Sequence, residues 1–225
     1  SDEPVDLMPD LDADVPTFPW GGMEEVAVSP DGNKVYAIDS GGVDSTRHHM
    51  HIFDANTFEL IRTVGQRGKE PGDFNLPMQV ATAPDGTVYV VDGGNFRVQS
   101  FTSEGDFINT FGTAGRYRGN FSRPKGIATD QDNNVYVGDS AFGNFQIFNS
   151  EGQLLLFIGD RGNRGGPGKF MLPSGIEVDE DGRIYYADQF FRKIDIFRPA
   201  NLTIEDGYLG TRYKDQIREE MEREK

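Results

Sequence analysis

Short apolar runs alternate with turn residues along almost the whole chain. In one representative stretch, turns at Pro84-Asp85-Gly86 and Glu104-Gly105 separate runs that are rich in Val, Tyr and Phe. The four runs of this stretch are VAT at 80–82, VYVVD at 88–92, VQSF at 98–101 and FINTF at 107–111. Such runs, bounded by Asp-Gly or other Gly-containing turns, are typical of β-hairpins. The pattern therefore predicts four short antiparallel strands in about 40 residues.

The stretch is repeated, which predicts a repeat architecture. Its marks recur at spacings of 47 and 49 residues, and they are Phe74, Phe121 and Phe170; Pro77, Pro124 and Pro173; Asp92, Asp139 and Asp188. A looser copy starts at Trp20. A period of about 40 to 50 residues is typical of propellers and solenoids. Since each sheet has two apolar faces, we expect an all-β propeller whose blades stack around an axis.

One polar position is common to all four copies. Asp39, Asp92, Asp139 and Asp188 each end the second strand of their unit. Repetition in every blade favours a structural role, in which the carboxylate accepts backbone N–H bonds or pairs with a basic residue of the third strand.

Composition excludes several kinds of chemistry. The 225 residues contain no cysteine, which rules out disulfides, thiolate metal sites, a cysteine nucleophile and covalent haem attachment. The formal net charge of −15 argues against a nucleic-acid partner, because a polyanion is bound by a basic surface. No apolar run approaches the length of a membrane span.

The chain divides into three segments. Residues 1–19 form an acidic, Pro-rich N-terminal arm, residues 20–210 contain the repeats, and residues 211–225 form a charged tail. In the tail, Tyr213, Ile217 and Met221 recur every four residues, which predicts a helix with a narrow apolar stripe. We expect this stripe to bind either the propeller itself or a partner.

Charge is distributed unevenly between the expected faces of the propeller. The loops between blades share one face, and their basic residues include Arg67, Lys69, Arg116, Arg118, Arg161 and Arg164. The hairpin turns share the opposite face and are rich in Asp and Glu. The sequence therefore predicts a basic face that binds an acidic protein partner, although turn preferences alone also explain the acidic turns.

The three histidines, His48, His49 and His51, lie together in the first unit. On a strand, His49 and His51 point to the same face, so together they could ligate a metal or a non-covalent haem iron. They also align with ordinary polar positions of the third strands, namely Arg97, Asn144 and Lys193 for His49, and Gln99, Gln146 and Asp195 for His51.

The marks Gly-x-Phe-x-x-Pro, Asp-Gly, VYVxD, RVQxF and FxxxFG resemble the NHL repeat, whose family forms six-bladed β-propellers. Units three and four are similar to extracytoplasmic bacterial propellers that accompany multihaem c-type cytochromes. This resemblance implies an extracytoplasmic protein that associates with a cytochrome or other subunits of a complex. Only four units are visible, so the chain forms either a four-bladed ring, or an open arc completed by another chain, or part of a longer ring.

Two functional interpretations follow. The favoured one is a non-enzymatic interaction platform or accessory subunit, without a cofactor. The alternative is a metal-dependent lyase or hydrolase, or a ligand-binding propeller, using the His cluster or the central channel. The candidate channel residues are Glu25, Gln79, Lys125 and Glu177, and they do not form the convergent Glu, Asn and Asp set of a calcium-dependent lactonase.

Overall fold

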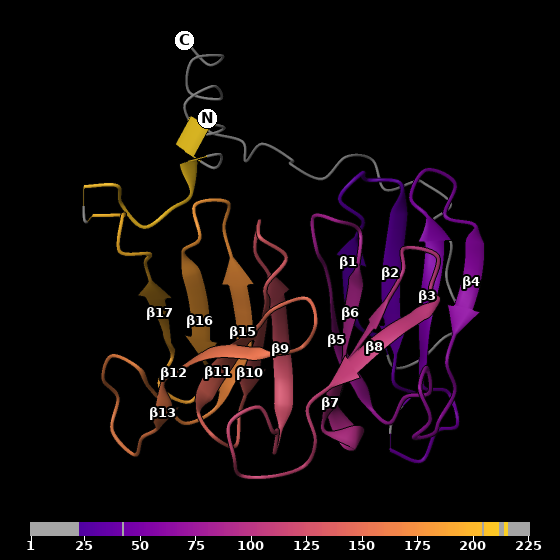
Figure 1. Ribbon diagram of the computed structural model, residues 1–225, viewed down its shortest axis with the longest axis horizontal. Helices are drawn as coiled ribbons and strands as arrows, with labels where there is room; N and C mark the ends of the chain where they lie inside the picture. Colours follow the sequence, from indigo (N-terminus) through magenta and orange to yellow (C-terminus); the bar gives the residue numbers. More distant parts are fainter. Residues whose placement is uncertain (1–22, 42, 204, 212–213, 216–225) are drawn as a thin grey trace, which may run out of the picture.

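The computed structural model describes residues 23–41, 43–203, 205–211 and 214–215, and here the regular secondary structure consists almost entirely of β-strands joined by turns and loops (Figure 1). The predicted all-β propeller is confirmed, with one blade for each of the four repeats. Blades 1 to 3 are four-stranded antiparallel sheets and blade 4 has three strands. The strands are β1 (Met23–Val28), β2 (Lys34–Asp39), β3 (His49–Asp54) and β4 (Leu60–Val64) in blade 1; β5 (Pro77–Thr82), β6 (Val88–Asp92), β7 (Arg97–Phe101) and β8 (Phe107–Phe111) in blade 2; β9 (Pro124–Thr129), β10 (Val135–Asp139), β11 (Asn144–Phe148) and β12 (Leu154–Ile158) in blade 3; β15 (Pro173–Val178), β16 (Ile184–Asp188) and β17 (Lys193–Phe197) in blade 4. A parallel pair, β13 (Asp160–Arg161) and β14 (Lys169–Phe170), and one short 3-10 turn, η1 (Gly93–Asn95), lie in the connections.

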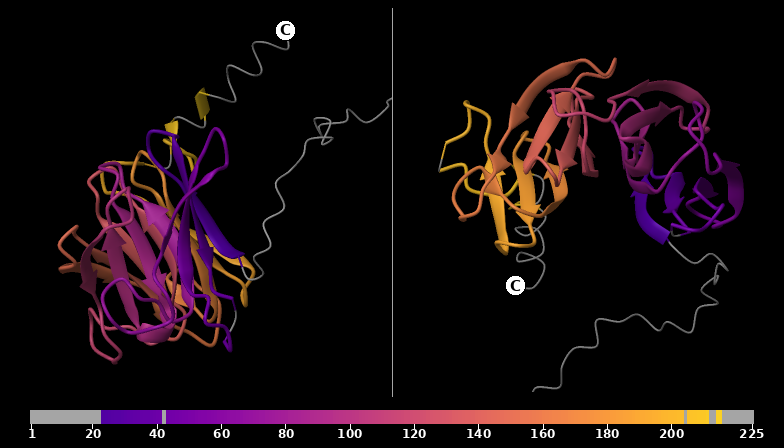
Figure 2. Two further views of the ribbon diagram at one scale, coloured as in Figure 1. Left: turned by 90° about the vertical axis from the view of Figure 1, so that its right-hand side faces the viewer. Right: turned by 90° about the horizontal axis from the view of Figure 1, so that it is seen from below.

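The blades follow one another around an arc (Figure 2, right). Their first strands line the axis, with β1 beside β5, β5 beside β9 and β9 beside β15. Between β15 and β1 the described residues show no packing of comparable extent. Blades 1 and 4 are therefore the two ends of the arc, so this arrangement agrees with the open arc rather than the tight ring.

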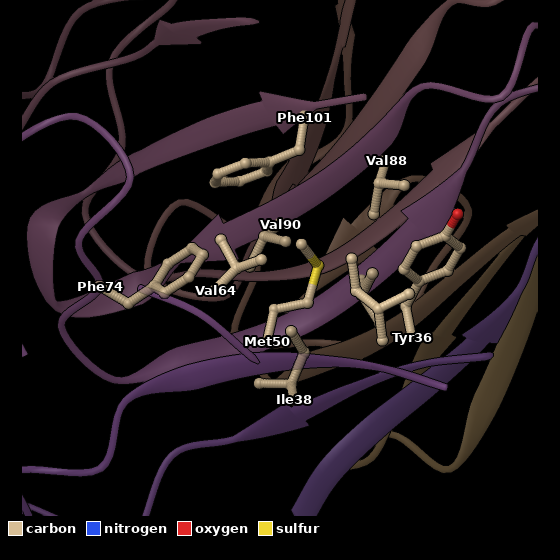
Figure 3. Close-up of a cluster of buried hydrophobic side chains, with 10 residues drawn as sticks. Tyr36, Ile38, Met50, Val64, Phe74, Val88, Val90 and Phe101 are labelled. Atoms are coloured by element: carbon tan, nitrogen blue, oxygen red, sulfur yellow. The ribbon is translucent and has the colours of Figure 1, made fainter. Parts of the chain in front are cut away.

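Three apolar seams hold the blades together. The seam between blades 1 and 2 contains Tyr36, Ile38, Met50 and Phe101 (Figure 3). Alternation along β6 explains why this strand reads VYVVD: Val88 and Val90 face blade 1, while Tyr89 and Val91 face blade 3. A sheet covered on both faces requires apolar residues at every position, whereas a half-exposed sheet does not.

The strand-ending aspartates have the predicted structural role in blades 2, 3 and 4. One carboxylate oxygen of each accepts a hydrogen bond from the loop that enters the same blade: Asp92 Oδ1 from Asn75 N at 2.6 Å, Asp139 Oδ2 from Ser122 N at 2.7 Å, and Asp188 Oδ2 from Met171 N at 2.6 Å. The ion pair of Asp92 with the third-strand Arg97, at 2.7 Å, was also predicted. These bonds tie each loop to its blade.

Blade 4 ends differently from the others. Among the described residues, blade 4 has no fourth strand. The described segment after β17 contacts the turn between β15 and β16 and does not pair with β17. The buried Arg183 pairs there with Asp181 at 2.6 Å, and Asp181 also accepts a bond from Thr211 N at 3.0 Å. The turn therefore anchors the start of the C-terminal segment.

Both predicted terminal segments fall largely outside the described residues. The arm at 1–19 lies outside them, as do Tyr213, Ile217 and Met221. Of the predicted tail, Thr211, Lys214 and Asp215 are described and are helical. In the described part of the chain, no helix has the length and apolar character needed to cross a membrane.

Candidate functional site

The connections gather on two opposite sides of the propeller, as expected. In blades 2, 3 and 4, backbone hydrogen bonds join the strand 2–strand 3 connection to the loop that enters the blade, for example Ser140 N to Arg123 O at 3.0 Å and Gln189 N to Leu172 O at 3.1 Å. We call this side, which includes η1 at the lower end of Figure 1, the loop face. Figure 2 (right) views the molecule from this side.

All six basic residues predicted to bind a partner are exposed on the inter-blade loops. They are Arg67, Lys69, Arg116, Arg118, Arg161 and Arg164. Three of them also hold the loops in place. Arg67 donates to Ser45 O at 3.0 Å, Arg161 donates to Ala141 O at 3.3 Å, and the Arg118 guanidinium lies 4.0 Å from the Phe157 ring centroid.

Two further features of the loop face are an exposed tyrosine and a cavity, of which the cavity was not predicted from the sequence. Tyr117 is 83% exposed at the tip of its loop, between Arg116 and Arg118. A cavity of about 500 Å³ spans the entrances of blades 2, 3 and 4. Its apolar lining includes Leu76, Met78, Phe96 and Leu172, and its cationic lining is Arg123 and Lys125.

The opposite, turn face carries the acidic residues, and many of their carboxylates stabilise the turns. The pKa of Asp31 is lowered to about 2 by hydrogen bonds from the Ser29 hydroxyl and Asn33. The pKa of Asp54 is lowered mainly by backbone N–H bonds from Thr57 and Asn56. These contacts support the interpretation that turn preference accounts for much of the acidic character of this face.

The central channel contains three of the four predicted polar residues. It forms a cavity of about 740 Å³ lined by the first strands of all four blades, with Glu25, Gln79 and Glu177 on its wall. Gln79 Nε2 donates to Glu25 Oε2 at 3.0 Å. Desolvation by the channel wall, with a further contribution from the charge of Glu25, raises the pKa of Glu177. Lys125 instead lines the cavity on the loop face.

The three histidines separate into two environments. His48 is buried at the seam between blades 1 and 2, where Leu76 N donates to its Nδ1 at 3.2 Å. His49 and His51 lie on β3, with ring centroids 5.5 Å apart. Together with Asp39 on β2 they form the one group of three potential metal ligands found among the described residues. Burial lowers the pKa of both His49 and His51, which favours the neutral imidazole that binds metals.

The fold defines the chain as a β-propeller. Within it, residues 121–148, from the entrance of blade 3 to the end of its third strand, match the NHL repeat. A 46-residue stretch is 42% identical to the human E3 ubiquitin-protein ligase TRIM32, and this stretch covers 20% of the chain and 7% of TRIM32. An NHL propeller is a typical protein-interaction domain.

Solved structures share the architecture. A structural genomics protein of unknown function from Bacteroides thetaiotaomicron superimposes with a TM-score of 0.60 at 19% identity, over 78% of this chain and 47% of that one. Hydrazine synthase from Kuenenia stuttgartiensis superimposes with a TM-score of 0.55 at 16% identity, over 81% of this chain and 51% of that one. The chain thus spans about half the length of these solved chains, and at such identities the likeness concerns the fold alone.

Proposed function

We propose that the protein is a non-enzymatic interaction platform that binds an acidic segment of a partner protein on its loop face. The observation that carries this proposal is the cavity of about 500 Å³ at the entrances of blades 2 to 4. Half-buried Leu76, Met78 and Phe96 offer an apolar surface, and Arg123 and Lys125 supply positive charge beside it. An apolar side chain flanked by carboxylates matches both features, since buried anchors and charge complementarity together define a binding site.

The charge of the surrounding loops supports the same occupant. The six exposed basic residues of the inter-blade loops lie on this face of a chain whose net charge is −15. Such a local positive field attracts an acidic partner and speeds encounter, whereas the rest of the surface repels it. Tyr117, 83% exposed between Arg116 and Arg118, adds an aromatic contact of the kind that is enriched in binding hot spots.

The proposed setting is an extracytoplasmic electron-transfer assembly, in which the partner is a multihaem cytochrome or a neighbouring subunit. The support for it is the resemblance of units three and four to propellers that accompany such cytochromes. Purification of the native protein with its partners, followed by an optical spectrum, tests the setting: a haem absorption band in the complex is expected, and a haem-free complex contradicts it.

The alternative is a lyase, hydrolase or ligand-binding protein that uses the channel. Its support is the raised pKa of Glu177 in a cavity of about 740 Å³, since shifted carboxyl groups are common in active sites. We favour the platform because Glu25 and Gln79 are already hydrogen-bonded to each other and Ile127 N donates to Gln79 Oε1 at 3.2 Å. These bonds give the channel side chains a structural role.

A peptide-binding experiment tests the platform. Peptides are selected on the intact protein from a random displayed library, and their affinity is then measured by fluorescence anisotropy at increasing salt. We expect the selected peptides to combine Asp or Glu with an apolar residue and to bind more weakly as salt rises, because exposed charges are screened within about 10 Å at 0.1 M. Replacing Arg123 and Lys125 with Ser should weaken binding at least about tenfold.

The matched control removes two positive charges from the turn face. Lys34 and Arg62, which pair there with Glu104 and Asp106, are replaced with Ser. Affinity should change less than twofold, since exposed ion pairs contribute at most about 1 kcal/mol to folding and lie far from the cavity. Equal losses in the two variants, or binding that is insensitive to both, would contradict the proposal.

A further inference from the structure

A second site of potential chemistry lies on blade 1, on the face that points away from blade 2. Asp39 and His49 are direct cross-strand partners in the β2–β3 pair, and His51 lies two residues further along β3. One ligand atom of each side chain lies within 4.8 Å of the other two. Since Tyr36, Ile38, Met50 and Ile52 face blade 2, the alternation of the strands places Asp39, His49 and His51 on the opposite face.

In the other blades, the residues that correspond to His51 accept hydrogen bonds from the backbone of a loop. Gln99, Gln146 and Asp195 correspond to His51, and each accepts a bond from the backbone N–H of a loop glycine, namely Gly72, Gly119 and Gly168, at 2.9, 2.7 and 2.8 Å. These residues tie the loop to the blade. His51 instead contacts the hydroxyl of Thr63 on β4, with 2.9 Å between Nδ1 and Oγ1.

Asp39 also differs from its equivalent in blade 3 in the hydrogen bonds that its carboxylate accepts. In blade 3, both carboxylate oxygens of Asp139 accept backbone N–H bonds. Asp39 Oδ1 accepts one such bond, from Gly41 N at 2.9 Å. Asp39 Oδ2 is fully buried and accepts no hydrogen bond from the described residues. A buried carboxylate oxygen without a donor is costly, and a bound cation would offset that cost.

The orientation of the imidazole of His51 suits a cation at this point. When Nδ1 carries the proton and donates to Thr63, the lone pair lies on Nε2, which is 3.9 Å from Asp39 Oδ2. Metal-binding histidines typically donate the N–H of their second ring nitrogen to an outer acceptor, which orients the ring, and the Thr63 hydroxyl can accept in that way here. His49 is only half-buried, so the group remains accessible from solvent.

We propose that Asp39, His49 and His51 bind a divalent transition metal such as Zn²⁺. Two imidazoles and one carboxylate are the ligands of zinc and of non-haem iron sites, whereas Ca²⁺ and Mg²⁺ prefer oxygen ligands alone. Three protein ligands leave at least one coordination position for water. The metal ties β2 to β3 at the end of the arc, where blade 1 has no described blade beside this face.

Metal titration of the intact, chelator-washed protein tests the proposal. Zn²⁺ is titrated in competition with a chromophoric chelator, and Co²⁺ is titrated while its visible spectrum reports the coordination number. We expect one strongly bound ion per chain. The variant H49N/H51Q should lower the affinity at least about 100-fold, and T63V, which removes only the outer partner of His51, about 10- to 100-fold.

The substitutions are chosen to preserve the fold. Asn and Gln are the residues that blade 3 carries at these two positions, Asn144 and Gln146. Replacing the exposed Asp44 with Asn is the control for general loss of negative charge, and it should leave the affinity unchanged. Far-UV circular dichroism verifies folding. If H49N/H51Q does not fold, H49N alone, at the half-buried position, takes its place. Absence of strong binding to the wild-type protein, or equal affinity in the folded variants, would overturn the metal site.

Discussion

Replacing Asp139 with Asn should be among the most destabilising single changes in the propeller. Asp139 is fully buried and accepts four backbone N–H bonds. Oδ2 accepts from Ser122 N and Arg123 N at 2.7 and 3.0 Å, and Oδ1 accepts from Ala141 N and Phe142 N at 2.9 and 3.0 Å. An amide has a single oxygen, so its NH₂ group must face two of these donors.

The size of the effect follows from those two lost bonds. A hydrogen bond to a charged group contributes about 1.5–3 kcal/mol, and a buried donor left without a partner costs a similar amount. We therefore expect Asp139→Asn to lower the free energy of unfolding by about 3–5 kcal/mol. This is a large part of the total stability of a typical domain, about 5–15 kcal/mol.

The same substitution at Asp39 is the matched control, because it occupies the equivalent place in blade 1. Asn at 39 keeps an oxygen for the Gly41 N–H, and its NH₂ group takes the place of Oδ2, which accepts no hydrogen bond from the described residues and lies 3.9 Å from His51 Nε2. In the presence of a chelator, Asp39→Asn should change the stability by less than about 1 kcal/mol. Urea unfolding followed by circular dichroism measures both variants. Similar losses in the two variants, or a loss below about 1 kcal/mol for Asp139→Asn, would refute the reasoning.

Two further predictions concern backbone geometry and pH. Gly112 and Gly119 both have φ above +80°, but a Cβ at Gly112 would overlap the Phe121 ring, whereas a Cβ at Gly119 meets nothing within 4 Å. Thermal or urea unfolding should therefore show that Gly112→Ala costs about 2–4 kcal/mol and Gly119→Ala about 1 kcal/mol; equal costs would exclude the overlap. Burial raises the pKa of Tyr36 and Tyr89 from 10.0 to about 12. The folded protein thus holds these protons more tightly than the unfolded chain, so stability is fully present below pH 10 and falls between pH 10 and 12. Tyrosinate absorbance should rise there together with the loss of circular dichroism, and ionisation of both residues in a fully folded protein would contradict this.

The blade was predictable from the sequence, and so was the role of its aspartates. Asp92, Asp139 and Asp188 recur in register, and their bonds to the entering loops confirm the structural interpretation. The structural interpretation does not account for both carboxylate oxygens of Asp39, because its Oδ2 accepts no hydrogen bond from the described residues. Alignment showed that His49 and His51 replace ordinary polar residues, but it did not show that the carboxylate and both imidazoles meet on one face of β2 and β3.

The cavity on the loop face was beyond sequence reasoning for a different reason. Leu76, Phe96, Arg123 and Leu172 belong to three blades and are separated by many residues. Their meeting depends on the angle between neighbouring blades, which is determined by how the seams pack. No periodicity of the chain encodes that angle directly.

The sequence by itself determined the structure of the repeating unit, which is one blade of the propeller. Alternating apolar residues, Asp-Gly turns and a register of 47 and 49 residues specify four short-stranded sheets, because strand and turn preferences act between residues close in the chain. Only the tertiary structure decided the arrangement of the units: an arc with blades 1 and 4 at its ends, the side chains brought together on the loop face, and the Asp39, His49 and His51 cluster. The physical reason is that apolar burial is non-directional and stabilises any well-packed seam between blades. The contacts between residues far apart in the chain are therefore fixed only when all the seams have packed together.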